Sequence, residues 1–450
     1  MKASSDTLDA EQIVDNSPIG HIQILVTVLC TAVILIDGFN NQVMGYIMPQ
    51  LARVWDLPNA ALGPLVSAGF AGTLVGMLFV APQSDHIGRR RVMIVGTAWF
   101  GAMTLATSTA SSLYSLMTLR FLTGIGLGAV LPAAQTMIGE FCPKHRRSTF
   151  IVVGASGVTL GSLSAGVLSV LTLHRFGWPG VLWVGGGCPL VIAVLLIWAL
   201  PDTLDYLVNQ KKNQPAARAL ARRIDPRTAI PENTIITAAH NKKSGSFLPL
   251  FESGRAVGTT AIWFLFIANL MVYSFIQSLM PTLLVRLGHT EEIGITVTSV
   301  FVGGGFMSIF LFGPLMDKYL PYKVLTYSFA IGGVLVSLLG GVLANSTNVI
   351  IVAAFFTGFV VLGIQKSLVA LPSYFYPIGL RAAGLSWATG LARIGQTAGP
   401  SIASALLVMR WRPARLFYFS SAFMLGSAVW ALVLWRRYGG PEFGNKTSMV

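Results

Sequence analysis

The chain has 450 residues, of which 54% are hydrophobic and only 11% are charged, and its mean hydropathy is +0.68. A soluble domain has about 25% charged residues, so this composition excludes an ordinary soluble protein and indicates a membrane protein. The net charge of +14 does not indicate a nucleic-acid partner, because the basic residues gather in the segments on one predicted side of the membrane.

Apolar runs long enough for membrane helices recur along the whole chain. A hydrocarbon core about 30 Å thick requires roughly 20 apolar residues for each helical crossing. We predict twelve crossings, at 21–46, 61–82, 92–111, 115–139, 150–173, 180–200, 258–283, 294–314, 323–344, 348–373, 382–409 and 415–435. The first is too long to be a cleaved signal peptide. The predicted fold class is therefore an all-α integral membrane protein.

Basic residues set the expected orientation. They concentrate at Arg89–Arg91, at Arg146 and Arg147, and in the polar segment 201–255. If these segments are cytoplasmic, as the positive-inside rule requires, both termini are cytoplasmic too. The basic residues would then contact anionic membrane lipids. The three cysteines have no metal-ligand spacing, and no metal or other cofactor is expected.

Segment 201–255 divides the predicted crossings six and six. It reads as a cytoplasmic linker between an N-terminal half, 1–200, and a C-terminal half, 256–450, which ends in a cytoplasmic tail. Short signatures repeat across it: "APQSDHIGRRR" around Asp85 matches "GPLMDKYLPYK" around Asp317, and "CPKHRRS" matches "YPIGLRA". Paired six-helix halves are typical of transporters in which one half rocks against the other around a central site.

These residues resemble the major facilitator superfamily. The loop after the second crossing keeps Asp85, Gly88, Arg89 and Arg90 of that family's signature, and "RFLTGIGLGAVLP" resembles a signature of its proton-coupled members. Three stretches, "LIDGFNNQVMGYIMPQLARVW", "RFLTGIGLGAVLPAAQ" and "YPIGLRAAGLSWATGLARIGQTAGP", resemble the bacterial aromatic acid and proton symporters. Those symporters carry Asp-Gly-Phe-Asp in the first helix, whereas this chain has Asn40 in place of the second aspartate.

Charged residues inside the predicted membrane helices are the candidates for mechanism, because such charges persist only where they face a cavity or a partner. Asp37 and Arg120 lie at similar predicted depths, so they can pair, and separating them would load or unload a proton. The alternative is a fixed structural ion pair. We assign Asp37 and Arg120 to proton coupling.

The expected substrate site lies mainly in the C-terminal half. Arg393 offers a planar fork for a carboxylate, and Lys366 offers a mobile charge. Alternatively, Lys366 extends to the cytoplasmic surface, Arg393 caps backbone carbonyls, and Trp387 only packs. The predicted substrate-binding residues are Arg393, Lys366, Asn40, Asn41, Phe39, Gln365, Asn269, Tyr273, Gln277 and Trp387.

A further set of charged residues is expected to form a cytoplasmic gate that latches the two halves; for some of them the alternative is that they only fix the topology. This set consists of Asp85, Arg89, Glu140, Arg147, Asp317, Lys318 and Arg381.

The resemblance implies a monomeric proton-coupled importer of an aromatic carboxylate of the benzoate, hydroxybenzoate, phenylpropionate or phenoxyacetate type in a bacterial inner membrane. One alternative is a proton-exchanging exporter of another organic anion or drug, because a fold does not fix substrate or direction. A membrane sensor would need a signalling domain. Segment 201–255, the one long polar segment, is a poor candidate for such a domain because it shows no clear apolar core. An enzyme is not expected, since no nucleophile arrangement, histidine cluster or nucleotide loop is present.

Overall fold

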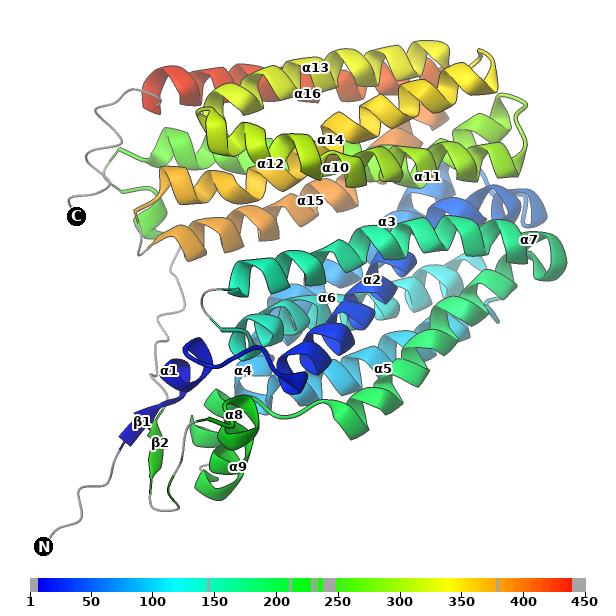
Figure 1. The fold of residues 1–450 in the computed structure, drawn as a ribbon. Helices are drawn as coiled ribbons and strands as arrows, with labels where there is room; N and C mark the ends of the chain where they lie inside the picture. The colour runs from blue at the N-terminus through cyan, green and yellow to red at the C-terminus, as the bar shows by residue number, and fades with distance from the viewer. Residues whose placement is uncertain are drawn as a thin grey trace, which may run out of the picture.

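The computed structural model describes residues 7–143, 146–209, 213–227, 231, 234–237, 248–252, 254–377 and 380–438. Long helices make up most of this part of the chain and lie roughly side by side (Figure 1). The long helices are α2 (His21–Val54), α3 (Asn59–Val75), α5 (Arg89–Thr107), α6 (Leu113–Phe141), α7 (Arg147–Ala199), α10 (Ala256–Arg286), α11 (Glu291–Met307), α13 (Pro321–Val342), α14 (Thr347–Phe375), α15 (Arg381–Val408) and α16 (Pro413–Tyr438). The short helix α12 (Ile309–Lys318) continues α11.

The shorter elements lie at the ends of the long helices and in the polar segment. They are β1 (Thr7–Asp9), α1 (Ala10–Asp15), the π-helical η1 (Gly76–Val80), the 3₁₀-helical η2 (Ala81–Gln83), α4 (Ser84–Ile87), α8 (Leu204–Asn209), α9 (Gln214–Ile224), β2 (Ile235–Thr237) and the 3₁₀-helical η3 (Leu248–Leu250).

Each predicted crossing falls on helical structure to within a few residues at its ends. In the described part of the chain, nine helices are long and apolar enough to cross a membrane. One of them, α7, carries the two predicted crossings 150–173 and 180–200 on either side of a kink at Gly177, whose positive φ of 64° suits glycine. The helices α5 and α15 are not among the nine. The number of crossings therefore stays a prediction.

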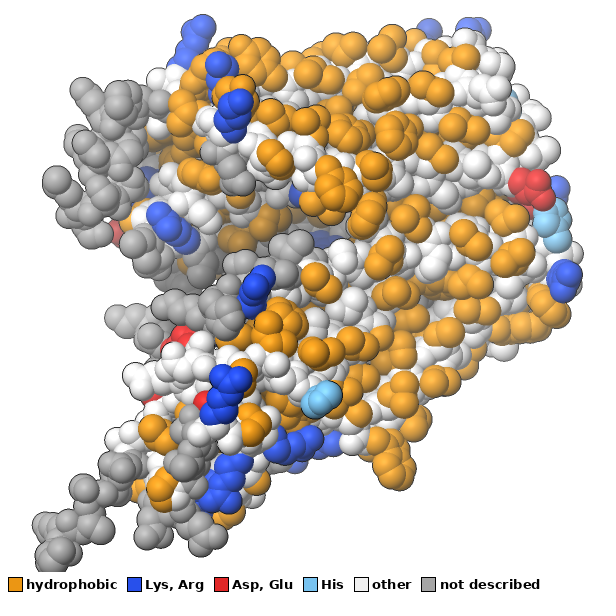
Figure 2. Space-filling view, viewed as in Figure 1, with side chains coloured by type: hydrophobic (Ala, Val, Ile, Leu, Met, Phe, Trp, Pro, Cys, Tyr) orange, Lys and Arg blue, Asp and Glu red, His pale blue; other side chains and the backbone are white. Residues whose placement is uncertain are grey.

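The helices form two bundles. In Figure 1, α2 to α7 lie in the lower group and α10 to α16 in the upper one. The bundles meet where α3 packs against α15, α2 against α10, and α7 against α11. At the end of the molecule nearest α1 and α8 the surface is hollowed between the bundles (Figure 2). The molecule is thus joined at one end and open at the other.

Segment 201–255 is more than a linker. Leu220 and Ile224 of α9 are buried together with Ile13 and Val14 of α1. Strand β2 pairs in parallel with β1, with Leu8 opposite Ile236. The expectation that this segment lacks an apolar core was wrong, because that core is completed by N-terminal residues about 200 positions away in the sequence. The resulting unit packs on the N-terminal bundle.

Close contact between α2 and α7 depends on glycine. A Cβ atom on Gly38 would lie 2.1 Å from the carbonyl oxygen of Val158, and one on Gly161 would lie 1.8 Å from that of Leu35. Membrane helices commonly approach through small residues in this way. These glycines therefore set the position of Asp37, which directly precedes Gly38.

We expect Gly161→Ala to lower the melting temperature of the purified protein, because α2 and α7 must separate to admit the methyl group. Overpacking of this kind costs about 1–3 kcal/mol. The matched control is Gly187→Ala on the same helix, where an added Cβ meets no atom within 4 Å. Thermal melts in detergent make the measurement, and equal melting temperatures for the two variants would contradict the role of Gly161.

Candidate functional site

Asp37 is the centre of the candidate site. It lies in the middle of the apolar helix α2, and only 5% of its surface is exposed. Asn41, one helical turn later, donates a hydrogen bond from Nδ2 to Asp37 Oδ2 over 3.1 Å. A carboxylate held in this way in a membrane helix requires a cation or a proton nearby.

That cation comes from the other bundle. Arg393 on α15 is half-buried and lies within electrostatic range of Asp37 and of Tyr273 on α10, although no ion pair joins it to Asp37. Its Nη1 donates a hydrogen bond to Gln396 Oε1 over 2.6 Å, which fixes one edge of the guanidinium group. The site therefore brings an acidic residue of one bundle and a basic residue of the other within electrostatic range.

Close packing of α10 and α15 positions Arg393. A Cβ atom on Gly395 would lie 2.2 Å from the carbonyl oxygen of Ile267, and one on Gly399 would lie 2.5 Å from that of Met271. These glycines therefore hold the helix that carries Arg393 directly against the helix that carries Tyr273.

Arg120 does not form the predicted pair with Asp37. It is also only 5% exposed, but its Nη2 donates to the backbone oxygen of Asn40 over 3.3 Å. Its Nε and Nη1 have no hydrogen-bond partner. The matching depths of Asp37 and Arg120 in the membrane were not enough to predict an ion pair. Depth does not indicate toward which neighbouring helix each side chain points. In this arrangement Arg120 is directed at the backbone of α2.

Asn40 and Phe39 point into the N-terminal bundle instead of the predicted substrate site. Asn40 Nδ2 donates to the carbonyl oxygens of Ile36 and Gly185, and Asn40 Oδ1 accepts from Thr104 Oγ1, all within 3.2–3.3 Å. The ring of Phe39 is buried against Gly185, where an added Cβ would lie 2.8 Å from it. Both side chains therefore pack α2 against its own bundle, and we correct their assignment to the substrate site.

The predicted polar stripe on α10 faces the bundle interface. Gln277 donates from Nε2 to the backbone oxygen of Asn41 over 3.4 Å, and Tyr273 stacks with Phe301 at a ring distance of 6.3 Å. Asn269 is buried, and neither atom of its amide has a partner. A buried amide without partners is costly, so this position suits a polar ligand or water.

Lys366 is held inside the C-terminal bundle. Its Nζ donates to the carbonyl oxygen of Gly305, which also accepts from Ser308 Oγ at the break between α11 and α12. Lys366 thus neither extends to the surface nor contacts Arg393 directly. The neighbouring Gln365 is half-buried, with its Oε1 unpartnered, and Trp387 is half-buried on α15.

The two bundles are tied together at the closed end. Ser67 on α3 donates to the backbone oxygen of Thr397 over 2.6 Å and accepts from Ser401 over 2.8 Å. An ion pair of 2.7 Å joins Arg53 to Glu291, and a hydrogen-bond contact of 2.6 Å joins His174 Nε2 to Glu292 Oε1. These contacts close that end of the molecule.

The predicted gate residues lie near the open end, and those that the structure describes are engaged within their own bundles. Arg89 pairs with Glu140, and Arg147 Nη2 pairs with Asp15 of α1 over 2.7 Å. Arg381 donates to the backbone oxygen of Tyr376, and Lys318 lies over the ring of Tyr319. The side chains of Asp85 and Asp317 lie outside the described part of the structure. We therefore expect these residues to latch the two halves together only in another conformation of the protein.

Sequence reasoning missed several residues of this arrangement. Gln396 carried a usable signal, since it lies three residues after Arg393 and so on the same helical face. The sequence gives no comparable indication for Ser67 and Ser401, because single serines are common in membrane helices. Among the described residues, no group of three His, Cys, Asp or Glu side chains is placed to hold a metal ion.

Two helical bundles, closed at one end and hollowed at the other, with opposite charges near their interface, are the architecture typical of membrane transporters. The chain matches the model of the Major Facilitator Superfamily over residues 30–290 and 262–449, and it belongs to that family. It is accordingly a multi-pass membrane transporter and not an enzyme.

Similar proteins agree with this assignment. The chain is 33% identical to a gallate transporter of Pseudomonas putida, over 89% of each chain. It is 32% identical to a 4-hydroxybenzoate transporter of Acinetobacter baylyi, over 90% of this chain and 89% of the other. The crystal structure of a D-xylose-proton symporter has the same fold, with a TM-score of 0.72 and 15% identity over 91% of this chain and 97% of the other. The predicted fold is confirmed.

We expect Asn40→Ala and Asn41→Ala to have different effects. Asn40→Ala removes three hydrogen bonds inside the N-terminal bundle and should lower stability by about 1–3 kcal/mol. Asn41→Ala removes one hydrogen bond to Asp37 and should impair uptake with little change in melting temperature. Thermal melts and uptake into proteoliposomes measure the two effects, and the opposite pattern would reverse the assignments.

Proposed function

We propose that this protein imports a small aromatic carboxylate together with protons across a bacterial inner membrane. The observation that carries this proposal is the placement of buried Asp37, held by Asn41, within electrostatic range of Arg393, which Gln396 orients from the other bundle. The names of its relatives, a gallate and a 4-hydroxybenzoate transporter, support the substrate class. The substrates of those relatives each combine an aromatic ring with a carboxylate.

Arg393 is the proposed anchor for the substrate carboxylate. A carboxylate leaving water loses several kcal/mol of hydration unless a cation and hydrogen bonds replace it. Arg393 supplies the charge in a planar fork, and Gln396 already orients that fork from one side. The ring of Tyr273, which stacks on the fully buried Phe301, lies within electrostatic range of Arg393, and the unpartnered amide of Asn269 offers polar contacts.

Competition for Arg393 is the proposed basis of coupling. While Asp37 is ionised, its negative charge lies within electrostatic range of Arg393 and competes there with the charge of a second anion. Protonation of Asp37 removes this competitor and leaves Arg393 free for the substrate. One proton would then accompany the anion, which is the condition for symport. Arg120, with two unpartnered guanidinium nitrogens below Asn40, is placed to assist as a second buried charge.

Alternating access then requires the two bundles to rock. We propose that 1–200 and 256–450 move as two bodies joined by segment 201–255, with both termini cytoplasmic. The hollow between the bundles then faces the cytoplasm, and the closed end with Ser67 and Ser401 faces outward. In the opposite state the residues Asp85, Arg89, Asp317 and Lys318 would latch the cytoplasmic side. The proposed working unit is a monomer.

We expect Arg393→Ala to weaken binding of 4-hydroxybenzoate by about 2–5 kcal/mol, the usual loss when one partner of a buried charge pair is removed. Lys366→Ala should weaken it far less, because Lys366 donates to the backbone of α11. Calorimetric titration of the purified variants makes the comparison, with thermal melts as the control for folding. If both variants bind like the wild type, the carboxylate is held elsewhere.

We expect Asp37→Asn to abolish accumulation of 4-hydroxybenzoate driven by a pH gradient in proteoliposomes, while exchange of substrate across the membrane continues. Binding to wild-type protein should weaken as pH rises, because ionised Asp37 then competes for Arg393, whereas binding to Asp37→Asn should not change with pH. Full accumulation by the variant would exclude Asp37 as the coupling site. Substrate leaving the vesicles as protons enter would instead establish an exporter.

A further inference from the structure

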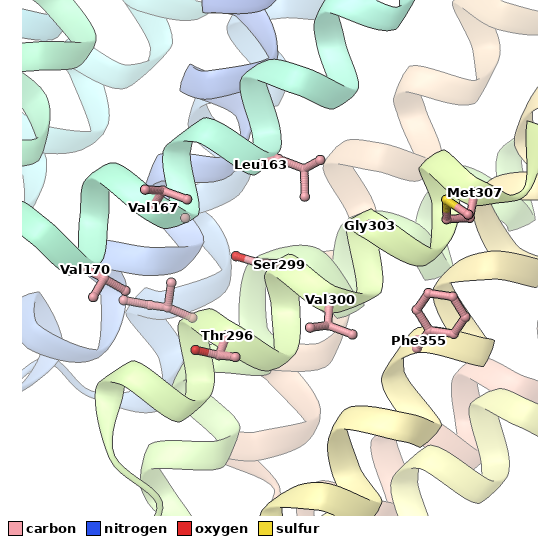
Figure 3. Close-up of a pocket in the computed structure, with 11 residues that line it drawn as sticks. Leu163, Val167, Val170, Thr296, Ser299, Val300, Gly303, Met307 and Phe355 are labelled. Atoms are coloured by element: carbon pink, nitrogen blue, oxygen red, sulfur yellow. The ribbon is translucent and has the colours of Figure 1, made fainter.

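An apolar groove lies on the outer surface of the protein, between the two bundles. Its walls come from α7 of one bundle and from α11 and α14 of the other, and it encloses about 510 Å³. Figure 3 shows side chains of both bundles around it, with Leu163, Val167 and Val170 on α7 and Val300 and Met307 on α11. The groove is separate from the site around Asp37 and Arg393.

The floor of the groove closes it off from the polar interior. Gly166 lies directly against the side chain of Ser299, where an added Cβ would be 2.1 Å from Ser299 Oγ. The Ser299 hydroxyl is itself hydrogen-bonded to the hydroxyl of Tyr46 over 2.9 Å. These contacts close the floor of the groove at Ser299.

The lining does not suit an anion or water. Among the described residues, no charged side chain lines the groove, and the side-chain hydroxyls in the lining are those of Thr296 and Ser299. Burying a carboxylate there would leave its charge without a cation. An aromatic acid is thus a poor occupant, whereas a hydrocarbon chain meets apolar surface along most of the lining.

The surroundings of the groove are membrane hydrocarbon. Val167 is 64% exposed on one rim, and Phe310 and Phe356 are 70% and 52% exposed near the other. Apolar side chains exposed on this scale on membrane-spanning helices face lipid, and the same kind of surface continues over the bundles in Figure 2. The molecules that can reach the groove are therefore membrane lipids.

The length of the groove matches one lipid chain. Its lining on α11 runs from Ile295 to Met307, which is about 18 Å at a rise of roughly 1.5 Å per residue. One leaflet of the hydrocarbon core is about 15 Å thick, half of the roughly 30 Å core. The groove begins one helical turn from Glu291, which is tied to Arg53 at the closed end. It therefore lies mainly in the leaflet on that side.

We propose that one acyl chain of a membrane phospholipid occupies the groove between α7 and α11 and stabilises the conformation with this end closed. The two walls belong to different bundles, so rocking changes the width of the groove. A chain that fits one width and not the other shifts the equilibrium toward the conformation it fits. The lipid therefore acts on the transport cycle without contacting the substrate.

The experiment uses the full-length protein in nanodiscs that contain a phospholipid with a photoreactive diazirine in its acyl chain. Cross-linked peptides are identified by mass spectrometry. Labelling should be several-fold greater at residues 163–170 and 295–307 than on the lipid-facing surfaces of α13 and α16. Equal labelling of all these surfaces would overturn the proposal, since it would show only a general lipid layer.

A matched pair of variants tests the groove itself. Gly303→Phe fills it, because an added Cβ there meets only Leu163, at 3.8 Å, while Gly426→Phe adds the same ring on α16, where no atom lies within 4 Å. Gly303→Phe should reduce labelling in the groove several-fold, and Gly426→Phe should leave it unchanged. Gly303→Phe should also reduce the rise in melting temperature that added phospholipid gives to the delipidated protein. Unchanged labelling and stabilisation in Gly303→Phe would contradict the proposal, as would labelling of the groove by a photoreactive aromatic acid.

Discussion

The central constraint is that Asp37 of one bundle and Arg393 of the other are charged groups placed within electrostatic range of each other inside the membrane. Each charge is costly there, and hydrogen bonds to Asn41 and Gln396 replace part of the lost hydration. Because the two residues belong to different bundles, a change in the charge of either one also changes the attraction between the bundles. Chemistry at the site is thereby connected to movement of the whole protein.

Close helix packing makes this interaction possible. Gly38 and Gly161 bring α2 against α7, and Gly395 and Gly399 bring α15 against α10. The backbone is therefore rigidly placed on both sides of the site, and side chains such as Asn40 that point away from it bind their own bundle. The buried amide of Asn269 on α10 has no hydrogen-bond partner and so retains polar groups that a ligand or water could satisfy.

The closed and open ends of the molecule are held by different kinds of contact. At the closed end, hydroxyl groups and an exposed ion pair between Arg53 and Glu291 connect the bundles over short distances. Exposed ion pairs contribute little, about 0–1 kcal/mol each, so this end can open again during a cycle. At the open end, Arg89 and Arg147 are paired within the N-terminal bundle and its attached α1, which leaves the bundles free to separate there.

The sequence by itself determined the helical membrane fold, the family and the candidate charges, because apolar runs and signatures such as "DGF" are local properties of the chain. It did not determine which charges meet. Asp37 was expected to pair with Arg120, but Arg120 donates to the backbone of Asn40 and Asp37 lies within electrostatic range of Arg393 instead. The side chains of Asn40 and Phe39 pack within their own bundle. The folded core of segment 201–255 was missed for the same reason. Partners far apart in the sequence are chosen by the rotation and packing of helices, and only the tertiary structure fixes these.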